Sequence, residues 1–153
     1  MGFPLLVVSN PPSGRGGSDR SPSIKSGNGP QRPPTILVVE DDILVRMPVA
    51  DYLRECGYRV IEASNAAEAQ SMFGAGEPIE IVFSDVNMPG EMNGFGLASW
   101  IRREHPDVKV ILTSGHRSAA KGAEDLCDEG PFLDKPYGYE VLLDHIKRLL
   151  AGS

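Results

Sequence analysis

The sequence predicts an α/β fold: a doubly wound parallel sheet of five strands, with about five helices on its two faces. From Thr35 onwards, short apolar runs alternate five times with longer segments of helical periodicity, which is the pattern of βαβ units. The runs at 36–39, 79–84 and 108–113 are largely apolar, as expected for central strands covered on both sides.

The first unit consists of the strand 36–39 and a helix over 43–56. Apolar residues recur in this helix at helical spacing, and Gly57 follows at a position where helices commonly end in a left-handed residue. Pro48 lies inside the helix and removes a backbone donor. We therefore expect it to kink or loosen the helix if it lies beyond the first turn.

The second unit begins with a strand at 58–63. Asn65 and Glu68 then form a capping-box pattern, which predicts the start of a helix. This helix is expected to end near Gly74 or Gly76.

The third strand, 79–84, leads directly to Asp85. A helix is predicted over 94–105, and Pro106 ends it because proline cannot continue the backbone ladder. The fourth strand follows at 108–113.

The remaining sequence completes the alternation. It predicts a polar helix at 118–129, a short strand at 132–134 and a closing helix at 139–150.

Residues 1–34 have a different composition, dominated by Gly, Pro and Ser. Such a segment buries too little apolar surface to offset its ordering entropy, so we predict a disordered tail. A short recruiting arm, or upstream sequence from a wrongly chosen start codon, are alternatives that the sequence leaves open. We expect one domain at 35–151 and no output domain.

Charge and composition exclude several classes of function. Residues 1–34 hold four basic side chains and one acidic one, a net of +3, which leaves 11 basic and 20 acidic residues, a net of −9, in the rest of the 153 residues. An acidic domain is poorly suited to nucleic acid, and no apolar run is long enough for a membrane span. Cys56 and Cys127 lack the spacing of a disulfide framework or a zinc site, and we expect two partly buried free thiols in a cytoplasmic protein.

Three predicted strands end in side chains that can form one site. The strand 79–84 ends at Asp85 before a turn rich in Pro and Gly, the first strand runs into the acidic run 40–42, and the strand 132–134 is followed by Lys135. In a parallel sheet, ligands gather at the carboxyl ends of the strands. We therefore predict a divalent cation held beside a carboxylate nucleophile.

Four segments in combination resemble the receiver domain of bacterial two-component response regulators. They are Val38-Val39-Glu40-Asp41-Asp42, Ser84-Asp85-Val86-Asn87-Met88-Pro89-Gly90, Leu112-Thr113-Ser114-Gly115-His116 and Asp134-Lys135-Pro136. The resemblance covers 35–151 and implies a flavodoxin-like fold with strand order 2-1-3-4-5. It also implies that a sensor histidine kinase or phosphotransfer protein donates a phosphoryl group.

The resemblance assigns the acceptor and the cation ligands. Asp85 matches the phosphoacceptor, and Glu40 and Asp41 match the acidic pair that holds Mg²⁺ together with it. The backbone carbonyl of Asn87 would add a further oxygen, and water would complete an octahedron.

Further residues are assigned to the phosphoryl group and to the switch. Lys135 and the hydroxyl of Thr113 would contact phosphoryl oxygens, and a cis peptide between Lys135 and Pro136 would aim the lysine inward. Thr113 and Phe132 match the switch positions, although Phe132 lacks the hydroxyl of the more common Tyr. Residue by residue, ordinary structural roles compete with these assignments; the acidic run 40–42, for example, could simply cap a helix.

Three functions follow from these residues. The first is a stand-alone receiver that catalyses only its own phosphorylation and dephosphorylation and changes its affinity for an output protein. Its output face would comprise 118–129, Phe132 and 139–150. A phosphate sink for a kinase is the second, and a Mg²⁺-dependent phosphohydrolase is the third; the latter is weakened because Asn87 stands where a general acid is expected.

Overall fold

The computed structural model describes residues 32–115 and 131–152. All elements below belong to the unit Pro33–Ser153. The predictions made for residues 1–31 and for the polar helix at 118–129 lie outside the described residues. No helix in the described part of the chain is long and apolar enough to cross a membrane.

Five parallel strands form one sheet, as predicted. In chain order they are β2 (Thr35–Val39), β3 (Arg59–Ala63), β4 (Ile81–Asp85), β5 (Lys109–Ser114) and β6 (Phe132–Asp134). Their spatial order is β3-β2-β4-β5-β6, which is 2-1-3-4-5 when the strands are counted along the chain. The flavodoxin-like order that the resemblance implies is confirmed, and the three most apolar strands, β2, β4 and β5, are the central ones.

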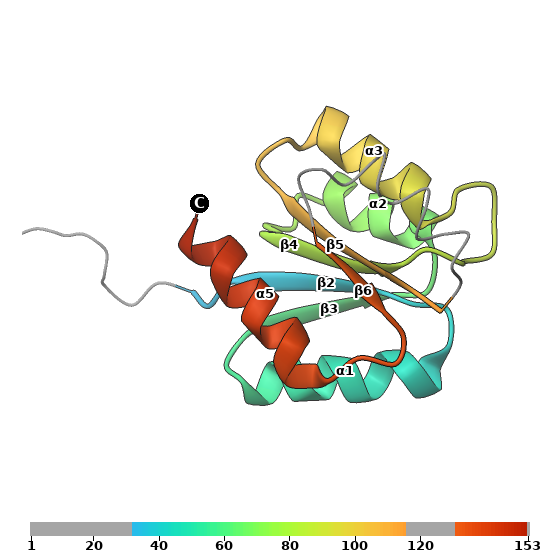
Figure 1. The fold of residues 1–153 in the computed structure, drawn as a ribbon. Coiled ribbons are helices and arrows are strands. Elements are labelled where there is room, and N and C mark those ends of the chain that lie inside the picture. Colours follow the sequence, from blue (N-terminus) through green and yellow to red (C-terminus); the bar gives the residue numbers. More distant parts are fainter. Residues whose placement is uncertain (1–31, 116–130, 153) are drawn as a thin grey trace, which may run out of the picture. The chain divides into compact units, whose positions relative to one another are not determined.

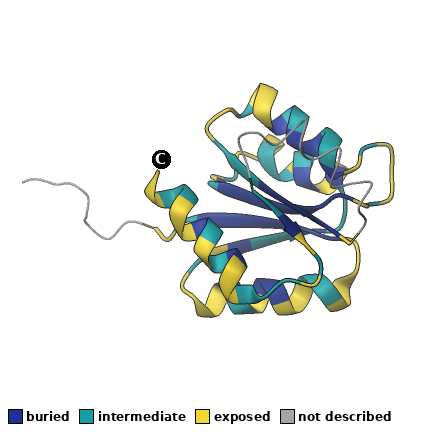
Figure 2. Cartoon of the chain, in the orientation of Figure 1, coloured by how far each residue is buried: buried dark blue, intermediate teal, exposed yellow. Residues whose placement is uncertain are grey.

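Helices cover both faces of this sheet (Figure 1). Helices α1 (Ile43–Glu55) and α5 (Tyr139–Ala151) lie on one face, and α2 (Ala66–Gly74) and α3 (Gly94–Glu104) lie on the other. Alternate residues of β2 face opposite layers: Ile36 and Val38 pack with the α1/α5 core, whereas Leu37 and Val39 pack with the α2/α3 core. Figure 2 shows the result as a sheet that is buried for most of its length, between helices that are partly exposed.

Asp42 caps the N-terminus of helix α1, and its side chain accepts a hydrogen bond from the N–H of Leu44 at 2.9 Å. The helix ends before Gly57, which has a φ of 101°, as predicted for a left-handed terminal residue. The helix continues through Pro48, although proline leaves the carbonyl of Leu44 without its intrahelical donor. Leu44 lies on the exposed side of the helix, where water can replace that donor.

The cap of α2 differs in one detail from the predicted capping box. The side chain of Asn65 accepts from the N–H of Glu68 at 2.8 Å, as expected. The carboxylate of Glu68 accepts from the N–H of Ser64, at 2.7 Å, rather than from that of Asn65. This hydrogen bond lowers the pKa of Glu68.

Several strand boundaries differ from the predicted ones by one or two residues, because the N–H groups at the strand ends donate to turns instead of to the neighbouring strand. Tyr58 and Val108 donate their N–H groups to preceding turns, so their strands begin one residue later. Strand β4 extends through Asp85, which pairs with Thr113. Cys56 is exposed rather than partly buried; it lies at the C-terminal cap of α1, beyond the last buried residue of that helix, Leu53.

Candidate functional site

Strand alternation places the predicted site residues on one face of the sheet. Side chains two residues apart along a strand share a face of the sheet. By this spacing, Glu40 is on the face of Ile36 and Val38, and Asp85 is on that of Ile81 and Phe83. Thr113 is likewise on the face of Ile111, and Lys135 on that of Leu133. Those preceding apolar residues all belong to the α1/α5 core. Strand register pairs Val39 with Ser84 and Asp85 with Thr113, so the chemical groups gather at the carboxyl edge of the sheet.

Three carboxylates meet at this edge. One oxygen from each of Glu40, Asp41 and Asp85 lies within 4.8 Å of the others. Glu40 and Asp85 are buried and Asp41 is exposed. Clustered hard oxygen donors with one side open to solvent fit Mg²⁺, which keeps several of its waters. The donor set therefore agrees with the predicted cofactor.

Lys135 joins two of these carboxylates. Its Nζ atom donates to Oε1 of Glu40 at 3.0 Å and lies 3.4 Å from Oδ2 of Asp85. The peptide bond between Lys135 and Pro136 is cis, as predicted. The N–H of Lys135 donates to the carbonyl of Ser114 at 3.0 Å, so the lysine is fixed to the end of the neighbouring strand.

Burial and charge shift the pKa values of this pair. Burial raises the pKa of Glu40, and the charge of Asp85 adds to this, while hydrogen bonds from Lys135 and from the N–H of Asp42 act in the opposite direction. Burial alone would lower the pKa of Lys135, but the hydrogen bond with Glu40 and the charge of Asp85 outweigh it and the net shift is upwards. The site thus holds its lysine charged beside carboxylates that repel one another.

Thr113 contributes a buried hydroxyl beside Asp85. It is the strand partner of Asp85 and is 2% exposed. Its Oγ1 atom has no hydrogen-bond partner among the residues that the structure describes. A buried polar atom without a partner is costly, so the hydroxyl is available to an oxygen that enters the site.

The loop after Asp85 is tied both to the Asp85 side chain and to β5. The N–H of Asn87 donates to Oδ1 of Asp85 at 3.3 Å, and Nδ2 of the same asparagine donates to Oγ of Ser114 at 3.2 Å. The predicted role of the Asn87 carbonyl as a cation ligand stays a prediction, as does the switch role of Phe132. Phe132 is half-buried and packs against the cluster that contains Val86.

Two residues important for this geometry were not found from the sequence. Gly94 starts α3, and a Cβ atom there would overlap the carbonyl oxygen of Asp85 and lie 2.7 Å from Cα of Val86. Arg46 reaches from α1 to the carbonyl oxygen of Glu40 at 2.8 Å. A glycine at the first position of a helix was a signal for the former; nothing in the sequence indicated the latter contact.

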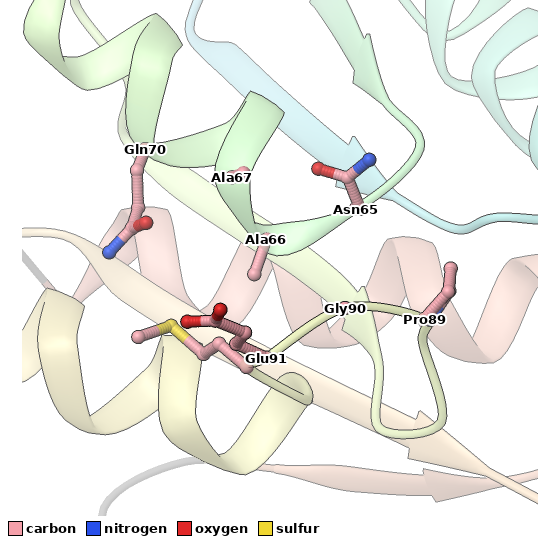
Figure 3. Close-up of a pocket in the computed structure, with 8 residues that line it drawn as sticks. Asn65, Ala66, Ala67, Gln70, Pro89, Gly90 and Glu91 are labelled. Carbon is pink, nitrogen blue, oxygen red and sulfur yellow. The ribbon is translucent and has the colours of Figure 1, made fainter.

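Two further surface features lie near the site. The first turns of α1 expose Ile43, Leu44 and Met47, which follow the acidic run 40–42 directly. Separately, a pocket of about 560 Å³ lies between the start of α2 and the loop after Asp85 (Figure 3). Its lining comprises Asn65, Ala66, Ala67, Gln70, Pro89, Gly90, Glu91 and Met92. None of these is a member of the carboxylate cluster, so the pocket and the cation site are separate features.

Known proteins share this sequence pattern. Residues 36–147 match the family model described as the response regulator receiver domain. The chain is 39% identical over 118 residues to the sensor kinase CckA of Brucella abortus, covering 76% of this chain and 12% of that protein. It is 30% identical over 119 residues to the response regulator receiver protein CpdR of Brucella abortus, covering 77% of this chain and 98% of that one. The chain spans between 12% and 49% of the length of four of its curated relatives.

Solved structures share the fold. A response regulator receiver protein from Sinorhizobium medicae is 25% identical, with a TM-score of 0.72 and coverage of 78% of this chain and 95% of that one. The response regulator TrrA of Thermotoga maritima, solved in complex with Mg²⁺ and BeF, is 29% identical, with a TM-score of 0.67 and coverage of 76% and 98%. Sequence, fold and site agree, and the chain belongs to the response regulator receiver domain family.

Proposed function

We propose that this chain accepts a phosphoryl group on Asp85, in a Mg²⁺-dependent reaction, from a histidine kinase or phosphotransfer protein. The observation that carries this proposal is the buried carboxylate of Asp85, which lies beside Lys135 and within 4.8 Å of the Glu40 and Asp41 carboxylates. The Mg²⁺ complex of TrrA and the relative named a sensor kinase support the cofactor and the class of donor.

The transfer would use the chain's own groups as follows. An oxygen of the Asp85 carboxylate bonds to phosphorus as the phosphorus–nitrogen bond of the donor's phosphohistidine breaks, and the imidazole leaves with the electron pair. Lys135 offers positive charge, and Thr113 its hydroxyl, to the transferred oxygens. When bound by Glu40, Asp41 and Asp85, Mg²⁺ supplies further neutralising charge.

The exposed apolar side chains of α1 supply a surface for the donor protein. Leu44 is 81% exposed, and it follows closely after Asp41 and the cation site. A donor must bring its phosphohistidine to Asp85, so it has to cover the rim of the site. Exposed large apolar residues beside a reactive centre are typical of such a contact.

Phosphorylation is proposed to change the affinity of the domain for a separate output protein, with Thr113 and Phe132 as switch residues. The phosphate-sink alternative predicts equal partner binding in the resting and the beryllofluoride-activated chain. Multiple turnover of a small phosphoester would instead support a phosphohydrolase. Against that third function, the side chain of Asn87 is an amide that donates to Ser114, and an amide cannot act as a general acid.

Residues 35–151 are proposed to suffice for phosphoryl acceptance, because every proposed site residue and every buried apolar residue in the described part of the chain falls within them. A chain that starts at Pro34 should keep the melting temperature and labelling rate of the full chain. A loss of several degrees would show that residues 1–33 support the domain. The cytoplasmic location, and the absence of direct nucleic-acid and membrane binding, stay predictions.

Labelling tests the proposed acceptor directly. The full chain is incubated with acetyl phosphate and Mg²⁺, reduced with borohydride to trap the acyl phosphate, and mapped by peptide mass spectrometry. Asp85 should carry the label, and Asp85→Asn should abolish it. Asp42→Asn is a matched control, because asparagine also caps helices and Asp42 lies outside the carboxylate cluster. Undiminished labelling of Asp85→Asn would refute the assignment.

A further inference from the structure

We propose that Arg46 is a positioning residue for the cation site and that Glu62 holds it in place. The inference rests on the proposed function, because it concerns the same carboxylates. The guanidinium of Arg46 spans two partners: Nη1 donates to the carbonyl oxygen of Glu40 at 2.8 Å, and Nε donates to Oε1 of Glu62 at 3.0 Å. Helix α1 is thereby tied to the ends of β2 and β3.

The Arg46 contact completes the fixation of the Glu40 backbone. The N–H of Glu40 donates to the carbonyl of Ala63 at 3.0 Å, which extends the pairing of β2 with β3 beyond Val39. Its carbonyl oxygen is held by Arg46. Because that oxygen and the N–H of Asp41 share one rigid peptide plane, the Arg46 bond sets the direction in which the chain proceeds to Asp41.

Asp41 depends on this direction more than the other carboxylates do. Its side chain is exposed, whereas those of Glu40 and Asp85 are buried and contact Lys135. The backbone therefore has the main part in bringing the Asp41 carboxylate within reach of the other two. The N–H of Asp42 in the same turn donates to Oε2 of Glu40 at 3.2 Å, so the turn also orients the Glu40 side chain.

Glu62 restricts the long arginine side chain to this conformation. The side chains of the pair are 15% and 24% exposed, so solvent screens them less than a surface pair. Arg54 also donates to Glu62, at 3.1 Å, but its other acceptors are Asp51 and the carbonyl of Val60. Two arginines of α1 thus donate to Glu62, and of these Arg46 also donates to the carbonyl oxygen of Glu40 in the cation-binding turn.

The charge of Arg46 and its role in positioning Glu40 predict opposite effects of an Arg46 substitution on Mg²⁺ affinity. A guanidinium next to the carboxylate cluster repels a divalent cation, so loss of its charge alone would tighten Mg²⁺ binding. Loss of a group that orients the ligands would weaken binding, as removal of outer partners in metal sites does. The direction of the change in the dissociation constant therefore separates the two effects.

The test is a Mg²⁺ titration of the full chain, in which the dissociation constant is read from backbone amide NMR shifts. Arg46→Gln should weaken binding roughly 10-fold, and Arg46→Lys and Glu62→Gln should weaken it in the same direction. Amide hydrogen exchange at Asp41 should become faster in each of these variants. Arg54→Gln is the matched control and should leave the dissociation constant at the wild-type value.

Unchanged or tighter Mg²⁺ binding by Arg46→Gln would overturn the inference while leaving the proposed function intact. Equal weakening by Arg54→Gln would also overturn it, because the effect would then belong to the ion pairs of α1 in general. If Arg46→Gln does not fold, Arg46→Lys and Glu62→Gln decide by the same criterion. A wild-type chain that does not bind Mg²⁺ would refute the proposed function itself.

Discussion

Replacing Thr113 by valine should stabilise the resting protein and impair its function. The Oγ1 atom of Thr113 is buried without a partner in the described residues, and valine has nearly the same shape. An unsatisfied buried polar group costs about 1–3 kcal/mol, so Thr113→Val should raise the free energy of unfolding by roughly 1–2 kcal/mol. In a domain of this size that corresponds to a rise in melting temperature of about 4 °C per kcal/mol.

Thr35 provides a matched control on β2, another strand of the same sheet. It is equally buried, but its Oγ1 atom accepts from Nη1 of Arg59 at 3.4 Å. Thr35→Val therefore removes a hydrogen bond and should not stabilise the protein. Urea denaturation of both variants and of the wild type, without Mg²⁺, measures the difference.

Function should change in the opposite direction to stability. Thr113→Val should label more slowly with acetyl phosphate, because a transferred oxygen loses its hydroxyl donor, and Thr113→Ser should restore much of the rate. If Thr113→Val is less stable than the wild type, the hydroxyl already has a partner in the resting state and the reasoning fails. Unchanged labelling by Thr113→Val would remove Thr113 from the proposed site.

Four further predictions concern other parts of the site. The pKa of Glu40 is raised in the folded state, so ionisation of this carboxyl lowers the free energy of unfolding as the pH rises through that pKa. Glu40→Gln should therefore raise the melting temperature without Mg²⁺ at pH 7, and this gain should shrink towards pH 4. A gain that is the same at both pH values would contradict the raised pKa of Glu40. Gly94→Ala should destabilise by about 1–3 kcal/mol through overlap with the Asp85 backbone, while Gly74→Ala, whose Cβ meets no atom within 4 Å, should not. Leu44→Asn should leave the rate of labelling by acetyl phosphate unchanged and slow transfer from a phosphorylated histidine kinase. If both donors phosphorylate the variant equally slowly, Leu44 has no role in docking the kinase. Phe132→Ala should leave the labelling of Asp85 intact and reduce the change in affinity for the output protein on activation. That change is of the order of 5–150-fold for a coupling of about 1–3 kcal/mol. A change in affinity as large as that of the wild type would exclude Phe132 as a switch.

Within the described residues, the sequence alone determined the helices and strands and the acidic and basic residues that meet at the carboxylate cluster. Strand alternation, the cap at Asn65 and the left-handed Gly57 are decided by interactions within a few residues, so local patterns predict them. The acids and the lysine were also visible, because each follows directly after an apolar strand. Within the described residues, the errors concerned boundaries such as Tyr58, where a turn competed with the strand for the N–H group, the partner of Glu68 in the cap of α2 and the burial of Cys56.

Only the tertiary structure decided how these residues meet. The register of Asp85 with Thr113, and the contact of Lys135 with Glu40 across 95 positions of sequence, depend on how separate helices pack on the sheet. The same holds for Gly94 against the Asp85 carbonyl and for Arg46 on that of Glu40. Such contacts join segments whose local sequences are independent of one another, so no pattern within either segment specifies the distance between them.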